Sequence, residues 1–176
     1  NTHYSRDDNL ISKNGLLNAS KFDIKDKLEV DYKNFTGPEY LIKKGMISTQ
    51  YSIPSLSNGI NNIVIHNTHL QSDSLGPIKN ICSHTREKQH KDIYEYLELF
   101  DNLDKPSTLH ALCGDINDDF EKIRLRKFVK KLPFQTKIKN SEKIITFNAL
   151  EDQLDYIIIN KNIDVKYSIV NMDNHL

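Results

Sequence analysis

Three short polar clusters follow apolar segments of the sequence, and they carry side chains able to do acid–base and phosphate chemistry. They span residues 66–72, 113–117 and 173–175. An imidazole can accept or donate a proton, a carboxylate can orient water or a cation, and an amide can donate to an anion. The candidate catalytic side chains in these clusters are His69, Asp115, Asn117 and His175. Active sites often form where several strands release their chains at one edge of a sheet, so we expect these clusters to meet.

The second cluster has a spacing that suits a binding site. Asp115 and Asn117 are two residues apart and would point the same way if the backbone stays extended. They would then offer a carboxylate and an amide to one ligand. Gly114 would let the chain turn tightly before the carboxylate. A Gly-Asp-x-Asn sequence is also an ordinary turn, and that alternative stays open.

Asp155 stands at the head of the apolar run 156–159. A carboxylate buried in such a strand must be paired or serve a site, because burying it alone is costly. The histidine at position 69 has an equally ordinary alternative, that of a hydrogen-bonded side chain at a strand end. The order of these residues along the chain is more informative than any one of them.

Regular elements must position the clusters, and the hydrophobic periodicity predicts them. Residues 46–53 alternate as a strand, the pair Asn58-Gly59 is typical of a hairpin turn, and 63–65 is apolar on both faces, as in a strand buried between two layers. Strands are predicted at 15–20, 46–53, 60–66, 108–113, 143–148, 154–160 and 165–170, and helices at 83–101 and 118–132. This pattern predicts an α+β layered fold with helices on the outside.

Composition limits the function classes. The chain has 176 residues with 24 basic and 24 acidic side chains, so a global basic excess for duplex binding is lacking. Two cysteines exclude a disulfide scaffold, and no apolar run is long enough for a transmembrane helix. The low cysteine content favours an intracellular protein, whereas Asn-x-Ser/Thr sites at Asn18 and Asn34 would permit secretion. We expect residues 1–176 to form a single domain.

Five motifs in a fixed order carry a resemblance to a known family. They are Asn67-Thr68-His69-Leu70, Arg86 with Gln89, Gly114-Asp115-Ile116-Asn117, Leu154-Asp155-Tyr156-Ile157 and His175-Leu176. In this order they resemble the endonuclease/exonuclease/phosphatase superfamily, which has the fold of pancreatic deoxyribonuclease. The segments 15–24 and 44–46 resemble two strands of the same superfamily. Within it, residues 68–73 with Cys82, His84, Arg86 and Gln89 look most like neutral sphingomyelinases.

The resemblance implies a four-layer α/β/β/α sandwich of the DNase I type, incomplete at the N-terminus and at the final strand. Residues 1–176 would then be a partial domain, the latter part of a larger one. The inositol-phosphatase branch is disfavoured, because Asp118 and Leu-Asp-Tyr replace its characteristic residues.

The resemblance also implies hydrolysis of a phosphodiester with Mg²⁺ or Mn²⁺. His175 would be the general base on water, and Asp115 would orient that water or bind near the metal together with His175. Asn67, Asn117 and His69 would bind the substrate phosphate, and His69 would assist the leaving group. Asp155 and Asn174 would support the site. The pair Arg86 and Gln89 would tie a helix to the sheet.

Two departures from the family keep other functions open. Asn174 stands where the family has an aspartate that orients the histidine. Residues 1–14 contain no counterpart of the family's metal-binding glutamate, which we therefore expect upstream of Asn1. The substrate is a sphingolipid, with peripheral membrane contact, or a nucleic acid cleaved by a nuclease of the same superfamily. A catalytically degenerate binding domain is the alternative of another class.

Overall fold

A computed structural model of the chain describes ten segments. They are residues 2–4, 15–37, 39, 42–54, 59–73, 79–100, 105–118, 123–133, 136–138 and 154–160. Their elements, in chain order, are β1 (Thr2–Tyr4), β2 (Leu17–Ala19), β3 (Ile24–Asp31), β4 (Gly45–Ser52), β5 (Asn62–His69), α1 (Lys79–Leu97), β6 (Thr108–Asp115), α2 (Ile123–Lys131), β7 (Thr136–Ile138) and β8 (Asp155–Asn160).

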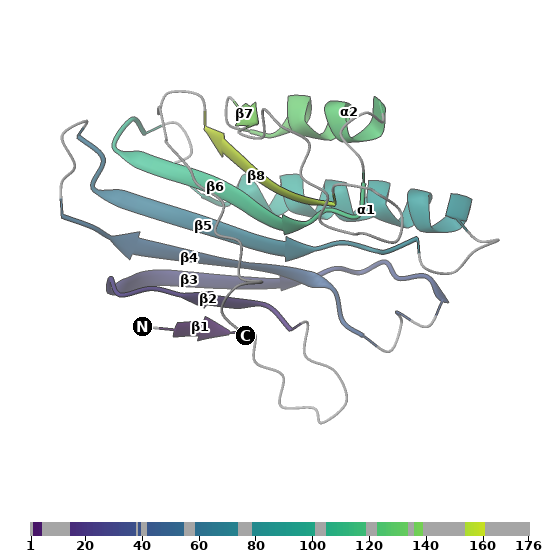
Figure 1. The fold of residues 1–176 in the computed structure, drawn as a ribbon, viewed down its shortest axis with the longest axis horizontal. Helices are drawn as coiled ribbons and strands as arrows, with labels where there is room; N and C mark the ends of the chain where they lie inside the picture. The colour runs from purple at the N-terminus through teal and green to yellow at the C-terminus, as the bar shows by residue number, and fades with distance from the viewer. Residues whose placement is uncertain are drawn as a thin grey trace, which may run out of the picture.

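A six-stranded mixed sheet organises the molecule (Figure 1). Its strand order is β3-β4-β5-β6-β8-β7, and β5 and β6 are parallel while the other pairs are antiparallel. The parallel pair is joined through α1, as a parallel connection requires a crossover. The carboxyl ends of β5 and β6 therefore lie beside the amino end of β8.

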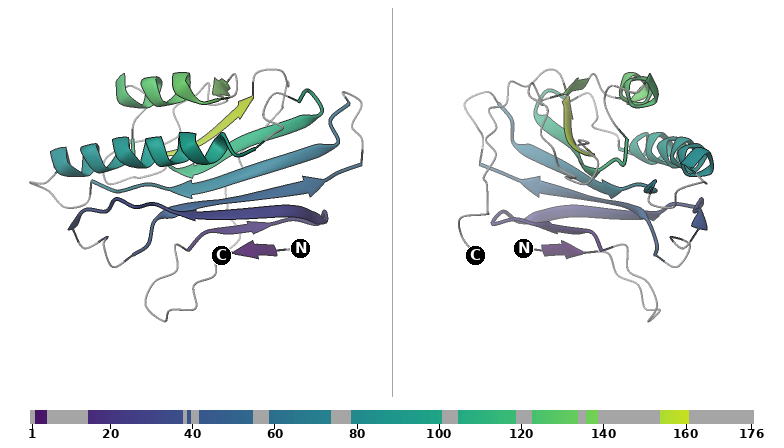
Figure 2. Two further views of the ribbon diagram at one scale, coloured as in Figure 1. Left: turned by 180° about the vertical axis from the view of Figure 1, so that it is seen from behind. Right: turned by 45° about the vertical axis from the view of Figure 1, so that its right-hand side comes forward.

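One face of the sheet is covered by both helices (Figure 2). Alternate side chains of the central strands point to this face and pack against α1 and α2. The packed cluster comprises Tyr32, Met46, Leu70, Ile93, Tyr96, Leu97, Leu112, Ile116, Leu125, Phe128, Val129, Leu132, Tyr156 and Ile158. This covered face is the hydrophobic core.

The opposite face is only partly covered by the described residues. β2 contacts β4 and β5 there, and the Asn18 amide nitrogen donates to Thr49 Oγ1 at 3.0 Å. A hollow of about 480 Å³ remains, and it is lined by Leu17, Asn18, Ala19, Ser20, Phe22, Tyr51, Ile63, Ile65, Asn67, Cys113 and Gly114. Within the described part of the chain, the architecture is thus one sheet with its helical layer, and only β1 and β2 stand where the second half of a sandwich would pack. This agrees with the predicted α+β fold, an incomplete sandwich.

Sequence patterns located most elements and misplaced several ends. β5 runs on to His69 and β6 to Asp115, so both residues belong to strands rather than to the loops after them. β5 is fully buried on one face only: Val64 is buried, whereas Ile63 and Ile65 are half-buried. β3 was not predicted, because its charged side chains leave it mostly exposed at the sheet edge. The predicted strands 143–148 and 165–170 lie outside the described residues.

The helices also begin and end at different residues from those predicted. α1 spans Lys79–Leu97 instead of 83–101, which shortens the loop after β5. α2 begins at Ile123 and ends at Lys131, before Pro133. Asp118, the predicted start of this helix, lies outside α2 and accepts from Arg124, a residue of its first turn. Among the described helices, none is long and apolar enough to cross a membrane.

Candidate functional site

Three neighbouring strands bring three of the candidate residues side by side. In the parallel pair, His69 of β5 is the register partner of Asp115 of β6. In the antiparallel pair, Asp115 is the register partner of Asp155, the first residue of β8. Paired residues of adjacent strands point to the same face, so the imidazole and both carboxylates share the less covered face of the sheet. The first two clusters thus meet at one edge together with Asp155, whereas the third cluster, residues 173–175, lies outside the described residues.

Gly114 allows this edge to form, but not by making a turn. It lies within β6 with a φ of +125°, and a Cβ at this position would stand 2.0 Å from the carbonyl oxygen of Thr68. No side chain could be accommodated against that backbone atom. The glycine therefore permits the close approach of β6 to β5, which corrects the expectation of a tight turn before Asp115.

His69 lies between a cation and an anion. Its Nε2 is 2.7 Å from Lys44 Nζ and 3.5 Å from Asp115 Oδ2. The His69 and Asp115 side chains are 38% and 32% exposed, so an incoming ligand can reach both. Lys44 has a side chain only 4% exposed and therefore acts on a ligand mainly through His69 and its electric field.

Contacts with Glu39, which is itself held by Ser72, fix the position of Lys44. Its Nζ is 3.7 Å from Glu39 Oε1, and Glu39 in turn accepts from the backbone nitrogen and hydroxyl of Ser72 at 3.2 and 2.5 Å. Residue 44 directly precedes β4, whose Gly45 is the register partner of His69. The sequence patterns did not indicate a role for Lys44 or Glu39. Their closeness to His69 depends on the pairing of β4 with β5, which separations in sequence do not reveal.

Burial sets the protonation of this group. Desolvation lowers the pKa of Lys44 and that of His69, and the neighbouring ammonium of Lys44 lowers the His69 pKa further. An ammonium has only donors, so a protonated Lys44 donates to Nε2 of a neutral His69 imidazole. Desolvation raises the pKa of Asp115 to about 6, and the nearby charge of Asp155 adds to this rise.

Asn117 is positioned differently from the prediction. Its φ is +52°, so the chain turns after β6 and the amide does not continue the direction of Asp115. The backbone nitrogen of Asn117 donates to Asp115 Oδ1 at 2.9 Å, and its side-chain nitrogen donates to the Leu70 carbonyl at 2.9 Å. Asn117 thus holds the Asp115 carboxylate and joins the segments that follow β5 and β6.

The remaining described candidates lie on the same face. Asn67 of β5 donates from its amide to the Leu17 carbonyl at 3.2 Å and borders the hollow beside β2. Asp155 is exposed, so it needs no partner to offset burial, in contrast to the argument from its apolar neighbours. Cys113 faces the same hollow, and burial raises the pKa of its thiol to about 11. Neither Cys82 nor Cys113 forms a disulfide.

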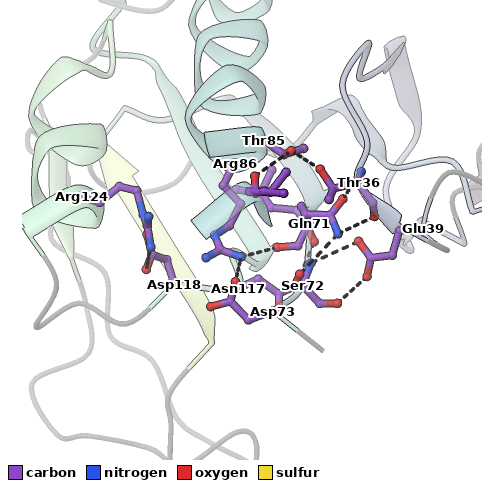
Figure 3. Close-up of polar contacts among 12 residues, drawn as sticks. Thr36, Glu39, Gln71, Ser72, Asp73, Thr85, Arg86, Asn117, Asp118 and Arg124 are labelled. Atoms are coloured by element: carbon purple, nitrogen blue, oxygen red, sulfur yellow. Dashed lines mark hydrogen bonds and ion pairs between the residues drawn. The ribbon is translucent and has the colours of Figure 1, made fainter. Parts of the chain in front are cut away.

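Arg86 connects α1 to the segment after β5 (Figure 3), and Gln89 makes a second connection to the same segment. The fully buried Arg86 donates from Nη1 to the Gln71 carbonyl at 2.8 Å and lies 2.8 Å from Asp73 Oδ1. Gln89 accepts from the Gln71 backbone nitrogen at 2.9 Å. These contacts agree with the expected tie between helix and sheet, and they fix the backbone that continues from His69.

The described residues contain only part of the predicted metal site. His175, Asn174 and Asn1 lie outside the described residues, and so does the glutamate expected upstream of Asn1. The described residues contain no cluster of three or more His, Cys, Asp or Glu side chains able to hold a metal, so they do not form the complete site that the motifs predict. Asp115 and Asp155 do fit one part of a hard-cation site. Both supply oxygen, and their adjacent charges, which contribute to the raised pKa of Asp115, would be relieved by a divalent cation.

Comparison with solved structures identifies the architecture. The sphingomyelinase C of Streptomyces griseocarneus matches with a TM-score of 0.64 and 17% identity, covering 85% of this chain and 53% of that one. A beta toxin from Staphylococcus aureus gives 0.62 and 20%, covering 81% and 52%. A truncated Caenorhabditis elegans TDP2 gives 0.56 and 16%, covering 82% and 55%. No protein-family model and no curated protein matches the sequence.

The chain spans about half the length of these structures, as the coverages of 52 to 55% show. Their shared architecture is the one that the motif order predicted. The chain therefore has the DNase I-like fold that the motif order predicted.

Proposed function

We propose that the protein is a divalent-metal-dependent phosphodiesterase that hydrolyses sphingomyelin to ceramide and phosphocholine. The juxtaposition of His69, Asp115 and Asp155 on three adjacent strands carries the proposal. It places an imidazole and two carboxylates at one accessible edge, beside a buried ammonium. This set can bind a phosphate, orient water and exchange a proton, and phosphodiester hydrolysis needs all three.

His69 is the proposed contact to the phosphate and to the leaving oxygen. Its neutral imidazole accepts from Lys44, so its other ring nitrogen carries the proton that can be donated. Lys44 holds the ring in this tautomer and contributes a positive charge behind it. As a phosphoryl oxygen gains negative charge in the transition state, this field becomes more favourable.

Asp115 is the proposed residue that orients the attacking water. Its Oδ1 is held by the Asn117 backbone, so Oδ2, which faces His69, remains in position for a ligand. Asn67 is a proposed substrate contact, and Asn117 a proposed donor to the phosphate. Asp155 and Asn174 are proposed supports. His175 remains the proposed general base, on the basis of the sequence motif alone.

Magnesium or manganese is the proposed cofactor. Asp115 and Asp155 would hold it together with His175 and residues beyond those described. When bound, the ion supplies a Lewis acid for the phosphoryl oxygens and lowers the pKa of bound water. A beta toxin from Staphylococcus aureus has been crystallised with bound magnesium ions, which supports this choice.

Sphingomyelin is preferred over nucleic acid for two reasons. The motifs after β5 resemble neutral sphingomyelinases, and the neighbouring structures include a bacterial sphingomyelinase C. The equal numbers of basic and acidic residues, 24 each, give no general attraction to a duplex. Such a substrate would require peripheral contact with a membrane.

Parallel hydrolysis assays test the proposal. Purified intact protein is incubated with sphingomyelin vesicles and with plasmid and abasic DNA, with Mg²⁺, with Mn²⁺ and with a chelator. We expect metal-dependent release of phosphocholine, and its loss in His69→Ala. Nicking of DNA without lipid turnover would instead establish a nuclease. No turnover of any phosphodiester, with no metal binding by calorimetry, would establish a degenerate binding domain.

Lys44→Met serves as the matched control for mechanism. It keeps the length of the buried side chain and removes its charge. We expect a lower kcat with a shifted pH profile, since His69 would lose the donor that fixes its tautomer. A variant with an unchanged pH profile would show that Lys44 does not act on His69, without affecting the assignment of His69.

A further inference from the structure

α2 has a strongly basic outer face. Its nine residues contain five cations and no acidic side chain. Leu125, Phe128 and Val129 are buried, and the opposite side exposes Arg126, Lys127, Lys130 and Lys131 together with Ile123, which is 69% exposed. The whole chain has no net charge, so this face is a local concentration of positive charge.

α1, the neighbouring helix, does not share this excess of basic over acidic side chains. α1 also exposes charged side chains, but it carries acidic as well as basic ones. Lys91 Nζ lies 3.5 Å from Glu95 Oε1, and His84 Nδ1 lies 3.7 Å from Glu87 Oε2. The two helices pack together, with His90 of α1 stacked on Phe128 of α2 at 4.1 Å between ring centroids. They share one layer but differ in the charge that they present.

Helix stability explains only part of this face. Lys130 and Lys131 lie in the last turn, where cations stabilise the helix dipole. Arg126 and Lys127 lie before that turn and gain little from it. Arg124 has a structural partner, because its Nε and Nη2 donate to the buried Asp118 at 2.5 and 3.0 Å (Figure 3).

This ion pair connects the basic face to the site. Asp118 follows Asn117, which holds the Asp115 carboxylate. The first turn of α2 is therefore anchored one residue beyond the catalytic edge. A surface that contacts the first turn of α2 therefore lies close to the segment that follows β6 and the proposed residue Asp115.

We propose that the exposed face of α2 docks the protein on an anionic lipid surface. Four cations on a helix of nine residues attract lipid headgroups, and Ile123 supplies an apolar side chain that can enter the interface. α2 exposes no aromatic ring for stacking on bases, and the chain has no overall basic excess that would favour a nucleic acid. The choice of lipid rests on the proposed function, but docking itself requires no catalysis.

Vesicle co-sedimentation tests the inference without using sphingomyelin. Intact protein is mixed with vesicles of phosphatidylcholine, alone or with phosphatidylserine, at low and high salt. We expect binding only to the anionic vesicles and release by salt. Lys127→Glu with Lys130→Glu should weaken binding by at least about 25-fold, since each lysine near an anionic surface contributes about five-fold.

The matched control is Lys25→Glu with Lys27→Glu on β3, at the far edge of the sheet from α2 (Figure 1). It changes the net charge equally and should leave binding within about two-fold. The neutral variant Lys127→Gln with Lys130→Gln guards against misfolding of the charge-reversed helix, checked by circular dichroism, and should bind with intermediate affinity. Equal losses in the α2 and the β3 charge-reversal variants, α2-dependent binding to DNA but not to vesicles, or no binding to anionic vesicles would each overturn the inference. Loss of lipid hydrolysis with docking retained would overturn the proposed function alone.

Discussion

His66 and His69 lie three residues apart on β5 and point to opposite faces of the sheet. His66 is fully buried on the helix-covered face, where its Nδ1 lies 2.7 Å from Ser48 Oγ and its Nε2 lies 3.1 Å from His110 Nδ1. His69 is partly exposed on the other face, between Lys44 and Asp115. The same strand thus supplies a buried core histidine to one face and an accessible histidine to the other.

The two histidines differ in whether their ring nitrogens are satisfied by buried partners within the protein. On the covered face, His66 and His110 stack at 5.4 Å and neither is open to a ligand. On the other face, Asp115 has a raised pKa, and its Oδ2 faces an exposed imidazole. Incompletely satisfied groups at an accessible edge indicate function, whereas satisfied buried groups indicate stability.

The largest expected effect is on the accessible face. Asp115→Asn keeps the size of the side chain and removes its charge, and we expect metal-dependent phosphodiester hydrolysis to fall by about 10³-fold. The free energy of unfolding should not decrease, because burial already disfavours the charged form of this residue. Steady-state kinetics and urea unfolding on the same preparation check both parts. Activity within ten-fold of wild type would remove Asp115 from the site.

The second prediction concerns the covered face. Leu112→Ala empties a fully buried position in the core cluster and should lower the free energy of unfolding by about 2–5 kcal/mol. Leu99→Ala makes the same change at a side chain that is 68% exposed and should cost less than about 0.5 kcal/mol. Urea denaturation measures both. Similar losses in the two variants would contradict the assignment of the core.

The covered histidines also predict an acid sensitivity. Desolvation lowers the pKa of His90 from 6.5 to about 3, so the unfolded chain binds more protons between these values. Stability from this group is complete above pH 6.5 and decreases as the pH falls toward 3, by up to about 1.4 kcal/mol per pH unit. His90→Gln should reduce the slope of the unfolding free energy against pH by up to about 1.4 kcal/mol per pH unit in this range. An unchanged slope would show that His90 is protonated in the folded protein.

The smallest predicted effect concerns the attachment of β2. Asn18 donates to Thr49 Oγ1 at 3.0 Å and to the Ile65 carbonyl at 3.3 Å. Asn18→Ala should lower the free energy of unfolding by about 1 kcal/mol through loss of these hydrogen bonds. Thermal unfolding of the intact protein detects the change. No change would mean that β2 does not depend on this side chain for its position.

The sequence predicted those parts of the fold that depend on local patterns. β4, with its regular alternation, and β6 and β8, with their apolar runs, were recognised because their neighbours cover them. β3 was missed because an exposed edge strand needs little apolar surface: Lys25 and Lys27 face solvent. Helix ends shifted by about one turn, which is typical where capping does not fix them.

The candidate site also contains residues that local sequence patterns predict and residues that they do not. His69, Asp115 and Asp155 could be found from the sequence, because each stands at the end of a recognisable strand or motif. Lys44 and Glu39 could not, since their contacts arise only from strand register and from the path of the chain before β4. The turned backbone of Asn117 was also not predicted, because asparagine in a left-handed conformation has no distinctive local sequence.

The most direct test of the proposed site compares the two histidines of β5. His69→Gln and His66→Gln are assayed for metal-dependent phosphodiester hydrolysis, with each rate divided by the folded fraction. We expect a loss of at least about 100-fold for His69→Gln at wild-type stability. Folded His66→Gln should hydrolyse at a rate within a few-fold of wild type and have a lower Tm. Hydrolysis at the wild-type rate by His69→Gln would contradict the assignment of the accessible face as the active site.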